Sequence, residues 1–433
     1  MLKFTRPANL RKSLVEAYEY LQPSLENVLG YPVRLKSFSK RQSPKKASEW
    51  QSDGSLLIRL PGPKDEVGRT YLCLSKAAAN DEYCRQIAAR FVRLCADISR
   101  DAKQSWDVKA KLIREEQFLW DNAVLSQIYA GNQKYNALDL VGAAREASIF
   151  RYEGDPVRLG LLATWNWYKL KPKLEKQGCT VLSFDSPFDL RGRLRADKAS
   201  HLLADGCRSF FAINPKGAVF AWITLNEDLQ IRAPRGWQTV PSAYHSVPSI
   251  LTGRDLALAV NGHGETLLFN RELVLKWNRS GWHRVTGPPV SDLLKGYVSA
   301  AVAKRIIDVA LELSEQRKGA LIVVSKNCDK VLSGASKGVG SRFKDSPLFH
   351  FEAVGTETIS RLASIDGAMV IDDSGCVRNA GVILEVPEEF TASGEGARTA
   401  AASFASSYGI AIKVSHDGPI SVYQDSKEVR RIG

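Results

Sequence analysis

The sequence predicts an α/β domain with a mixed sheet at the C-terminal end of the chain, preceded by an α+β module and a β-rich module. Residues 1–149 combine a helix, a hairpin and long helices, whereas strands and turns dominate residues 150–289. Residues 290–433 alternate apolar strands with helices, which is typical of an α/β domain. The segment Thr286-Gly287-Pro288-Pro289 marks the clearest boundary, because Gly and Pro interrupt both helices and strands.

The N-terminal module is expected to be a small sensor-like unit. Apolar residues recur at near-helical spacing over residues 10–29, and Pro23 is expected to kink this helix or end it early. The basic stretch over residues 34–46 is interpreted as an exposed loop. The other elements expected here are strands over 56–60 and 70–74 and helices over 76–102 and 105–129.

Two hairpins define the β-rich module, whose function the sequence does not indicate. Phe210–Ile223 and Leu256–Phe269 each place two apolar runs around a short polar turn. The second turn carries Asn261, His263 and Glu265, which are residue types that also occur in metal sites. An Asn-Gly pair is a preferred hairpin turn, so turn formation explains this loop better than metal binding does.

The C-terminal module is expected to begin with a helix that is capped by Ser291 or Asp292 and runs to about Gln316. Six apolar residues at helical spacing form its buried stripe: Leu294, Val298, Val302, Ile306, Val309 and Leu313. Apolar strands and helices alternate after this helix, which predicts a mixed sheet packed against helices.

The composition indicates a soluble cytoplasmic protein. The 433 residues are 44% hydrophobic, which is enough for two or three cores. The sequence contains no run of 18 or more apolar residues, and its N-terminus lacks the apolar segment of a signal peptide. Its seven Cys residues form no CxxC pair, which argues for a reducing compartment and against zinc.

The net charge of +13 is unevenly distributed along the chain. Residues 290–433 contain 17 basic and 18 acidic residues, whereas residues 1–289 contain 43 basic and 29 acidic residues. An anionic partner would therefore bind the first 289 residues. The alternative is that this basic excess only keeps the surface solvated.

Two glycine-containing motifs near the C-terminal end indicate a nucleotide site. Asp366-Gly367-Ala368 lies between two apolar runs, and Gly396-Ala397-Arg398 lies where a loop enters a helix. Glycines let the backbone approach a ligand closely, while a helix N-terminus and an Arg bind phosphates. The Asp side chain can hold a metal or a hydroxyl group. The alternative is that the Asp-Gly pair only forms a hairpin turn.

These motifs and their order resemble the diadenylate cyclase (DAC) domain family, which includes the N-terminal domain of the DNA-integrity-scanning protein. The resemblance covers about residues 290–433, and Asp366-Gly367-Ala368 is its most specific part. It rests on five segments in order: Arg317–Val324, Leu362–Ile371, Asn379–Leu384, Gly396–Arg398 and Ile410–Tyr423. The resemblance implies that two ATP molecules are condensed into cyclic di-AMP with Mg2+ or Mn2+. Because each family domain binds one ATP, it also implies a homodimer or a higher oligomer.

The resemblance also assigns roles to individual residues. Asp366 and Arg398 are the implied catalytic residues, and Asp366 would also bind the metal. The implied nucleotide-binding residues are Gly367, Ala368, Val382, Ile383, Gly396, Ala397, Thr399 and Ser415, with Val382 or Ile383 at the adenine. His416 follows the Ser of the last strand, where the family often has a metal-binding Glu, so His416 is a candidate substitute ligand.

The second motif departs from the family pattern, which usually contains Arg-His-Arg after a Gly. With Gly396 as that Gly, Arg398 is the first Arg, and Thr399 and Ala400 replace the other two residues. With the spacing to the last strand kept, Arg398 is the second Arg, and Gly396 and Ala397 replace Arg and His. One Arg and no His remain in either alignment.

These departures leave two alternatives to a cyclase. The first is a DAC-like domain that has lost turnover and binds ATP or a cyclic dinucleotide as a sensor for the upstream modules. The second is a nucleic-acid-binding regulator that uses the basic residues 1–289. No helix-turn-helix, zinc or RNA-binding signature appears in those residues, so this alternative ranks last.

Overall fold

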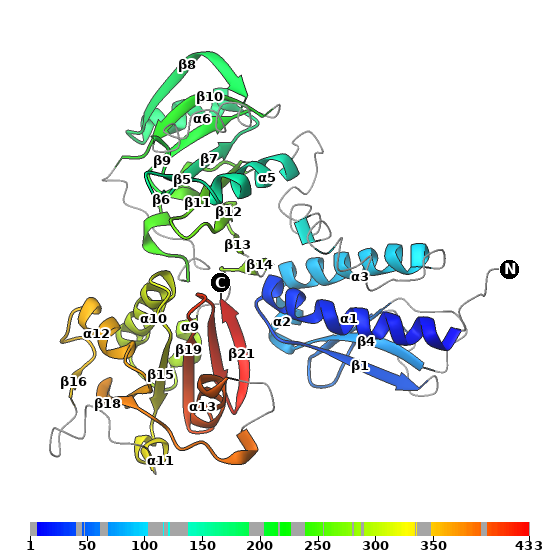
Figure 1. Ribbon diagram of the computed structural model, residues 1–433, viewed down its shortest axis with the longest axis vertical. Helices are drawn as coiled ribbons and strands as arrows, with labels where there is room; N and C mark the ends of the chain where they lie inside the picture. The colour runs from blue at the N-terminus through cyan, green and yellow to red at the C-terminus, as the bar shows by residue number, and fades with distance from the viewer. Residues whose placement is uncertain are drawn as a thin grey trace. The chain divides into compact units, whose positions relative to one another are not determined.

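The chain divides into two compact units, which are shown as a computed structural model in Figure 1. The first unit comprises Met1–Arg232 and Ser246–Arg284, and the second comprises Ala233–His245 and Val285–Gly433. The predicted division into modules 1–149, 150–289 and 290–433 stays a prediction. The structure describes residues 7–39, 46, 48–60, 68–102, 116, 120–121, 137–189, 203–214, 217–226, 239–253, 255–278, 281–286, 290–333, 335, 348–390 and 396–432.

The first unit begins with helices and an antiparallel sheet of four strands in the order β1-β4-β3-β2. The strands are β1 (Val33–Ser39), β2 (Ser48–Trp50), β3 (Leu56–Arg59) and β4 (Gly68–Leu74). The helices are α1 (Pro7–Leu29), α2 (Lys76–Asn80) and α3 (Glu82–Ala102).

Three sequence predictions for this region need correction. Residues 34–39 are not a loop, because Val33–Ser39 pairs along its whole length with β4. Pro23 does not end α1 early, because buried leucines on both sides of it anchor the helix through to Leu29, while the alternative of a kink stays a prediction. The helix expected over 76–102 is interrupted at Asp81, whose Oδ1 accepts a hydrogen bond from the Cys84 backbone N–H at 3.4 Å. The helix expected over 105–129 lies outside the described residues, apart from positions 116, 120 and 121.

A second sheet in the first unit has eight strands in the order β14-β13-β12-β11-β7-β9-β10-β8. The strands are β7 (Leu159–Ala163), β8 (Thr180–Asp189), β9 (Ser209–Ile213), β10 (Ala218–Thr224), β11 (Leu256–Val260), β12 (Thr266–Phe269), β13 (Val274–Asn278) and β14 (Gly281–Arg284). Only β7 and β9 are parallel among these neighbours. The other elements are α5 (Ala137–Ser148), α6 (Trp167–Lys176), α8 (Val247–Ile250) and the small pair β5 (Arg151–Tyr152) and β6 (Asp155–Pro156).

Both predicted hairpins are confirmed, as β9–β10 and β11–β12. In the second hairpin, Asn261 Oδ1 accepts hydrogen bonds from the backbone N–H groups of His263 and Glu265, each at 3.0 Å. The Asn261 amide also donates to the Glu265 carboxylate at 2.8 Å. These bonds confirm the interpretation of the loop as a turn.

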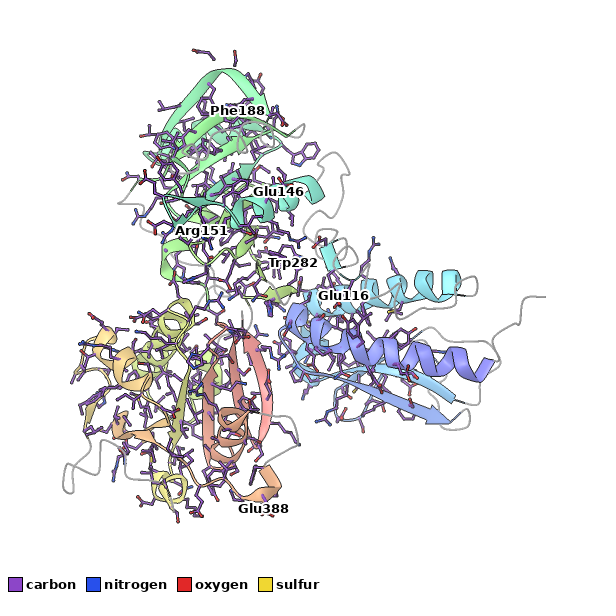
Figure 2. All side chains as sticks on the ribbon, in the orientation of Figure 1. Glu116, Glu146, Arg151, Phe188, Trp282 and Glu388 are labelled. Carbon is purple, nitrogen blue, oxygen red and sulfur yellow. The ribbon has the colours of Figure 1, made fainter. Side chains whose placement is uncertain are left out.

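Buried ion pairs with several partners join distant parts of the first unit. Arg145 donates two hydrogen bonds of 2.6 Å to Asp121, and Trp282 donates a third to the same carboxylate at 2.7 Å. Figure 2 labels Trp282, which lies on β14. Arg284, also on β14, contacts Asp81 at 2.6 Å. These pairs fix β14 to residues that are far away in the sequence.

The second unit contains the predicted mixed sheet, with seven strands in the order β16-β18-β17-β15-β19-β20-β21. The strands are β15 (Ala320–Ser325), β16 (Phe349–His350), β17 (Ala368–Ile371), β18 (Cys376–Val382), β19 (Gly409–Val414), β20 (Ile420–Gln424) and β21 (Lys427–Ile432). Strands β15 and β17 are parallel, and the other neighbours are antiparallel. The helices are α9 (Val290–Leu294), α10 (Ala300–Glu315), α11 (Cys328–Leu332), α12 (Thr356–Ala363) and α13 (Ala397–Ala405), with 3-10 turns η3 (Ser242–Tyr244) and η5 (Glu388–Phe390).

The prediction of a single helix from residue 291 to 316 is wrong, because these residues form two helices, α9 and α10. Ser299 ends the break, since its side chain accepts a hydrogen bond from the Val302 N–H at 3.2 Å and so caps α10. All six residues of the predicted apolar stripe are nevertheless buried. The stripe was correct because burial continues across the break.

Helix α13 covers one face of the seven-stranded sheet. Its Ala402 and Phe404 belong to a core cluster with Leu321, Val323 and Ala411 on the sheet. This packing fixes α13 against strands β15 and β19. Among the described residues of the whole chain, none of the helices combines the length and hydropathy that crossing a bilayer requires.

Candidate functional site

The Asp366-Gly367 turn joins α12 to β17 in the second unit. Gly367 has a φ of 110°, and a Cβ at this position would lie 2.6 Å from the Val382 carbonyl oxygen. Only glycine fits here, so the turn runs directly against β18. Asp366 Oδ1 accepts a hydrogen bond from the Gly367 N–H at 3.1 Å, and its side chain is 88% exposed. The turn therefore presents a carboxylate to solvent.

Apolar side chains lie beside this carboxylate. Ala368 pairs with Val382 in the sheet, and the Val382 side chain is buried in the core. The next residue, Ile383, is 52% exposed, and Ile365 is 40% exposed. Gly381 makes room for Ile365, because a Cβ on Gly381 would lie 2.8 Å from Ile365 Cγ2. Of the two residues predicted at an adenine, Ile383 is the one whose side chain a ligand can reach.

Arg398 lies in the first turn of α13, which starts at Ala397 after Gly396. Its Nη2 atom lies 3.5 Å from Asp366 Oδ1. The structure thus brings the two motifs together, with Arg398 in the first turn of α13. A helix N-terminus beside an Arg is a favourable place for an anion.

Gly319, just before β15, lies beside two side-chain donors, Arg398 and His416. A Cβ on Gly319 would lie 2.5 Å from Arg398 Nη1 and 2.9 Å from His416 Nε2, so both side chains converge over this glycine. The Gly319 N–H donates a hydrogen bond to His416 Nδ1 at 3.2 Å. With Nδ1 accepting, the neutral imidazole carries its proton on Nε2. Sequence reasoning missed this role, although Gly319 directly precedes an apolar strand.

The remaining predicted site residues have different surroundings. Thr399 Oγ1 accepts a hydrogen bond from Lys413 Nζ on β19 at 3.0 Å. Ser415 belongs to the turn after β19, where its backbone N–H donates to Pro419 at 2.9 Å and its carbonyl accepts from Gly418 at 3.0 Å. Lys413 was not predicted from the sequence, because the contact with Thr399 depends on how α13 packs on the sheet.

Metal binding has one suitable side chain in this cluster. The described residues contain no group of three or more His, Cys, Asp or Glu side chains that could hold an ion by themselves. The exposed Asp366 carboxylate suits a divalent ion that takes its other ligands from phosphates and water. His416 stays a prediction as a ligand, but its hydrogen bond from Gly319 favours a protonated, donating Nε2.

Comparison with known proteins identifies a DAC domain within the second unit. Residues 308–428 match the family model described as "DisA bacterial checkpoint controller nucleotide-binding". This confirms the predicted resemblance over these residues. A search of curated proteins found no match.

Two solved structures are similar to this part of the chain. One is a hypothetical membrane spanning protein from Bacillus cereus, with 22% identity and a TM-score of 0.26, over 33% of this chain and 67% of that chain. The other is a double mutant of DacA from Staphylococcus aureus, with 22% identity and a TM-score of 0.24, over 31% of this chain and 87% of that chain.

Proposed function

We propose that the protein is a diadenylate cyclase that condenses two ATP molecules into cyclic di-AMP under the control of its upstream modules. The observation that carries this proposal is the approach of Asp366 and Arg398 to 3.5 Å within a DAC domain. Family membership of residues 308–428 supports nucleotide chemistry. The exposed carboxylate next to an arginine supports a site in which a substrate hydroxyl and phosphates meet.

In the proposed reaction, the 3′-hydroxyl of one ATP attacks the α-phosphate of the other in line. A P–O bond forms to the ribose oxygen, the P–O bond to pyrophosphate breaks, and the hydroxyl gives up its proton. A second, equivalent step closes the ring. Positioning and charge neutralisation supply most of the acceleration in such phosphoryl transfers. Asp366, whose carboxylate is open to solvent, would orient the hydroxyl and accept its proton.

The phosphates would bind on the Arg398 side of the cluster. Arg398 and the backbone amides around Gly396 and Ala397 would bind phosphate oxygens, and Thr399 would add its hydroxyl. We place His416 with these groups as a donor, because the Gly319 N–H donates to its Nδ1, and because its Nε2 and Arg398 Nη1 both lie close to Gly319. The proposed role of His416 therefore changes from metal ligand to hydrogen-bond donor to a phosphate.

The adenine would bind beside the Asp366-Gly367 turn. Ile383 and Ile365 expose apolar surface there, and Gly367 and Ala368 let the backbone approach the nucleotide closely. Exposed apolar side chains next to a carboxylate suit a ligand with a flat ring and a sugar.

A divalent Mg2+ or Mn2+ ion fits this site only together with the substrate. Asp366 would hold the ion, and phosphate oxygens and water would complete its coordination. When bound, the ion neutralises phosphate charge and polarises the attacking hydroxyl. Two ATP-loaded domains would have to face each other, so the active form would be a homodimer or a higher oligomer.

The alternative function is a degenerate DAC-like sensor that binds ATP or a cyclic dinucleotide without turnover. Its specific support is the small side chains of Gly396 and Ala397, because neither residue supplies a side-chain donor next to Arg398. Incubation of the purified protein with ATP and Mn2+ or Mg2+, followed by mass spectrometry, separates the two functions. Cyclic di-AMP in the mixture supports the cyclase, whereas bound ATP without product supports the sensor.

A further inference from the structure

Lys413 is the one charged residue of strand β19, whose sequence is Gly-Ile-Ala-Ile-Lys-Val. It pairs with Leu321 of β15, while Ala411 pairs with Val323 two residues away. Leu321, Val323 and Ala411 all face the core cluster under α13. Because side chains two residues apart share a sheet face, Lys413 also lies on the α13 side. A lysine at a core-facing position of a strand costs stability unless it has a function or a good partner.

The Lys413 ammonium group lies at the first turn of α13. Its Nζ donates a hydrogen bond of 3.0 Å to Oγ1 of Thr399, the residue that follows Arg398. Since Thr399 Oγ1 accepts this bond, the hydroxyl proton points away from Lys413 and can be donated to another group. The contact thus orients a hydroxyl donor next to the Arg398 guanidinium.

The α13 segment itself supplies little positive charge. Gly394–Ala402 contains a single basic residue, Arg398, whereas a triphosphate carries several negative charges. Lys413 brings a second cation to the same helix end from a neighbouring strand. An ammonium group here strengthens both the local potential and the hydroxyl donor.

We propose that Lys413 is a positioning residue that holds Thr399 as a donor for the ATP phosphates and replaces positive charge that α13 does not supply. This inference rests on the proposed nucleotide site, but it does not require turnover. It predicts that Lys413 contributes to the binding of ATP and not to the binding of adenosine, which lacks the phosphates.

The test compares the full-length protein with the neutral variant Lys413→Met and the charge-preserving variant Lys413→Arg. We expect Lys413→Met to weaken ATP binding roughly ten-fold in calorimetry, as for the loss of one charge-assisted hydrogen bond. Adenosine affinity should stay the same, and Lys413→Arg should recover most of the ATP affinity. Lys427→Met, which removes an exposed lysine from β21 of the same domain, is the matched control and should bind ATP normally.

Thr399→Val and the double variant Thr399→Val/Lys413→Met show whether the two residues act together. If Lys413 acts through Thr399, the affinity of the double variant for ATP is little lower than that of the single variant with the lower affinity. If Lys413 were purely structural, Lys413→Met would instead lower the thermal midpoint and weaken the binding of ATP and of adenosine equally.

The outcomes distinguish this proposal from the cyclase proposal. If Lys413→Met loses ATP affinity and the wild-type protein makes no cyclic di-AMP, the first result supports the role of Lys413 and the second contradicts the cyclase. Unchanged ATP affinity and unchanged turnover in Lys413→Met overturn the role of Lys413 and leave the cyclase standing. A wild-type protein that binds neither ATP nor adenosine overturns both proposals.

Discussion

The two units contain arginine–carboxylate pairs of opposite character. In the first unit, Arg145 holds Asp121 through two bonds of 2.6 Å, and their side chains are only 15% and 9% exposed. In the DAC domain, Arg398 lies 3.5 Å from Asp366, whose side chain is 88% exposed. Trp282 donates to the Asp121 carboxylate, and the Arg145 guanidinium stacks 4.2 Å from the Trp277 ring. The buried pair is thus enclosed by protein groups, whereas the exposed pair is accessible to a ligand.

The difference in burial predicts that the first pair stabilises the fold, and it supports the proposed role of the second pair in ligand binding. A buried pair that loses one partner leaves an uncompensated charge in a poor solvent, so it is sensitive to mutation of either residue. An exposed pair at 3.5 Å is screened by water and adds little to folding. We therefore expect the proximity of Asp366 and Arg398 to matter more for ligand binding than for stability.

The largest expected effect is the loss of activity in Asp366→Ala. We expect cyclic di-AMP formation to fall to background, by about 10² to 10⁴-fold, because the group that orients the attacking hydroxyl is removed. The thermal midpoint should stay nearly unchanged, since the side chain is exposed. Asp417→Ala, which removes an exposed carboxylate from the turn after β19, is the control and should remain active. Unfolding of Asp366→Ala without a specific loss of activity would assign Asp366 to the turn instead.

The second effect is on stability and concerns the buried pair. Asp121→Ala leaves the Arg145 charge buried and removes the acceptor of Trp282, so it should destabilise the first unit by about 3–5 kcal/mol. Urea unfolding followed by tryptophan fluorescence measures this change. Asp366→Ala serves as the comparison and should shift the midpoint far less. Equal shifts in the two variants would remove the distinction between the pairs.

The third effect tests the convergence of donors over Gly319. A Cβ on Gly319 would meet both Arg398 and His416, whereas a Cβ on Gly355, the N-cap of α12, has nothing within 4 Å. Gly319→Ala should therefore displace the two donors and lower ATP affinity roughly ten-fold, as expected for one charged hydrogen bond. Gly355→Ala, the control, should bind ATP almost normally. An equal or larger loss of ATP affinity in Gly355→Ala than in Gly319→Ala would contradict the proposed donor arrangement.

The smallest effect links the two regions through charge. If two ATP-loaded domains must face each other, activity per protomer should rise with protein concentration until the dimers are saturated. The basic excess in residues 1–289 favours separation by repulsion, so a polyanion should raise activity several-fold at low protein concentration. Specific activity measured against concentration, with and without the polyanion, checks both points. Activity that does not depend on concentration would contradict dimer-dependent catalysis.

Local sequence patterns predicted the elements whose signals are local. The hairpins at Asn214 and Asn261 followed from turn chemistry between apolar runs, and the mixed sheet followed from alternating apolar segments. The break after α9 was missed because the apolar stripe continues through Val298. Strand β1 was missed because the basic residues Arg34 and Lys36 alternate with its apolar residues and continue into a basic stretch, although the strand pairs fully with β4.

The candidate site was predictable only in part for a related reason. Asp366 and Arg398 were predicted from short motifs, and the structure brings them together. Gly319 and His416 lie 97 residues apart, and Thr399 meets Lys413 only because α13 packs on β19. A single sequence contains no local signal for such contacts, because they depend on how the strands pair.

The most direct test of the proposed nucleotide site is a crystal structure of the protein with a non-hydrolysable ATP analogue and Mg2+. We expect the phosphates to be bound to Arg398 at the start of α13 and the adenine to lie against Ile383. The Asp366 carboxylate should be turned toward the ion or the 3′-hydroxyl. A nucleotide bound elsewhere, with Asp366 and Arg398 still paired and untouched by ligand, would contradict the proposed site.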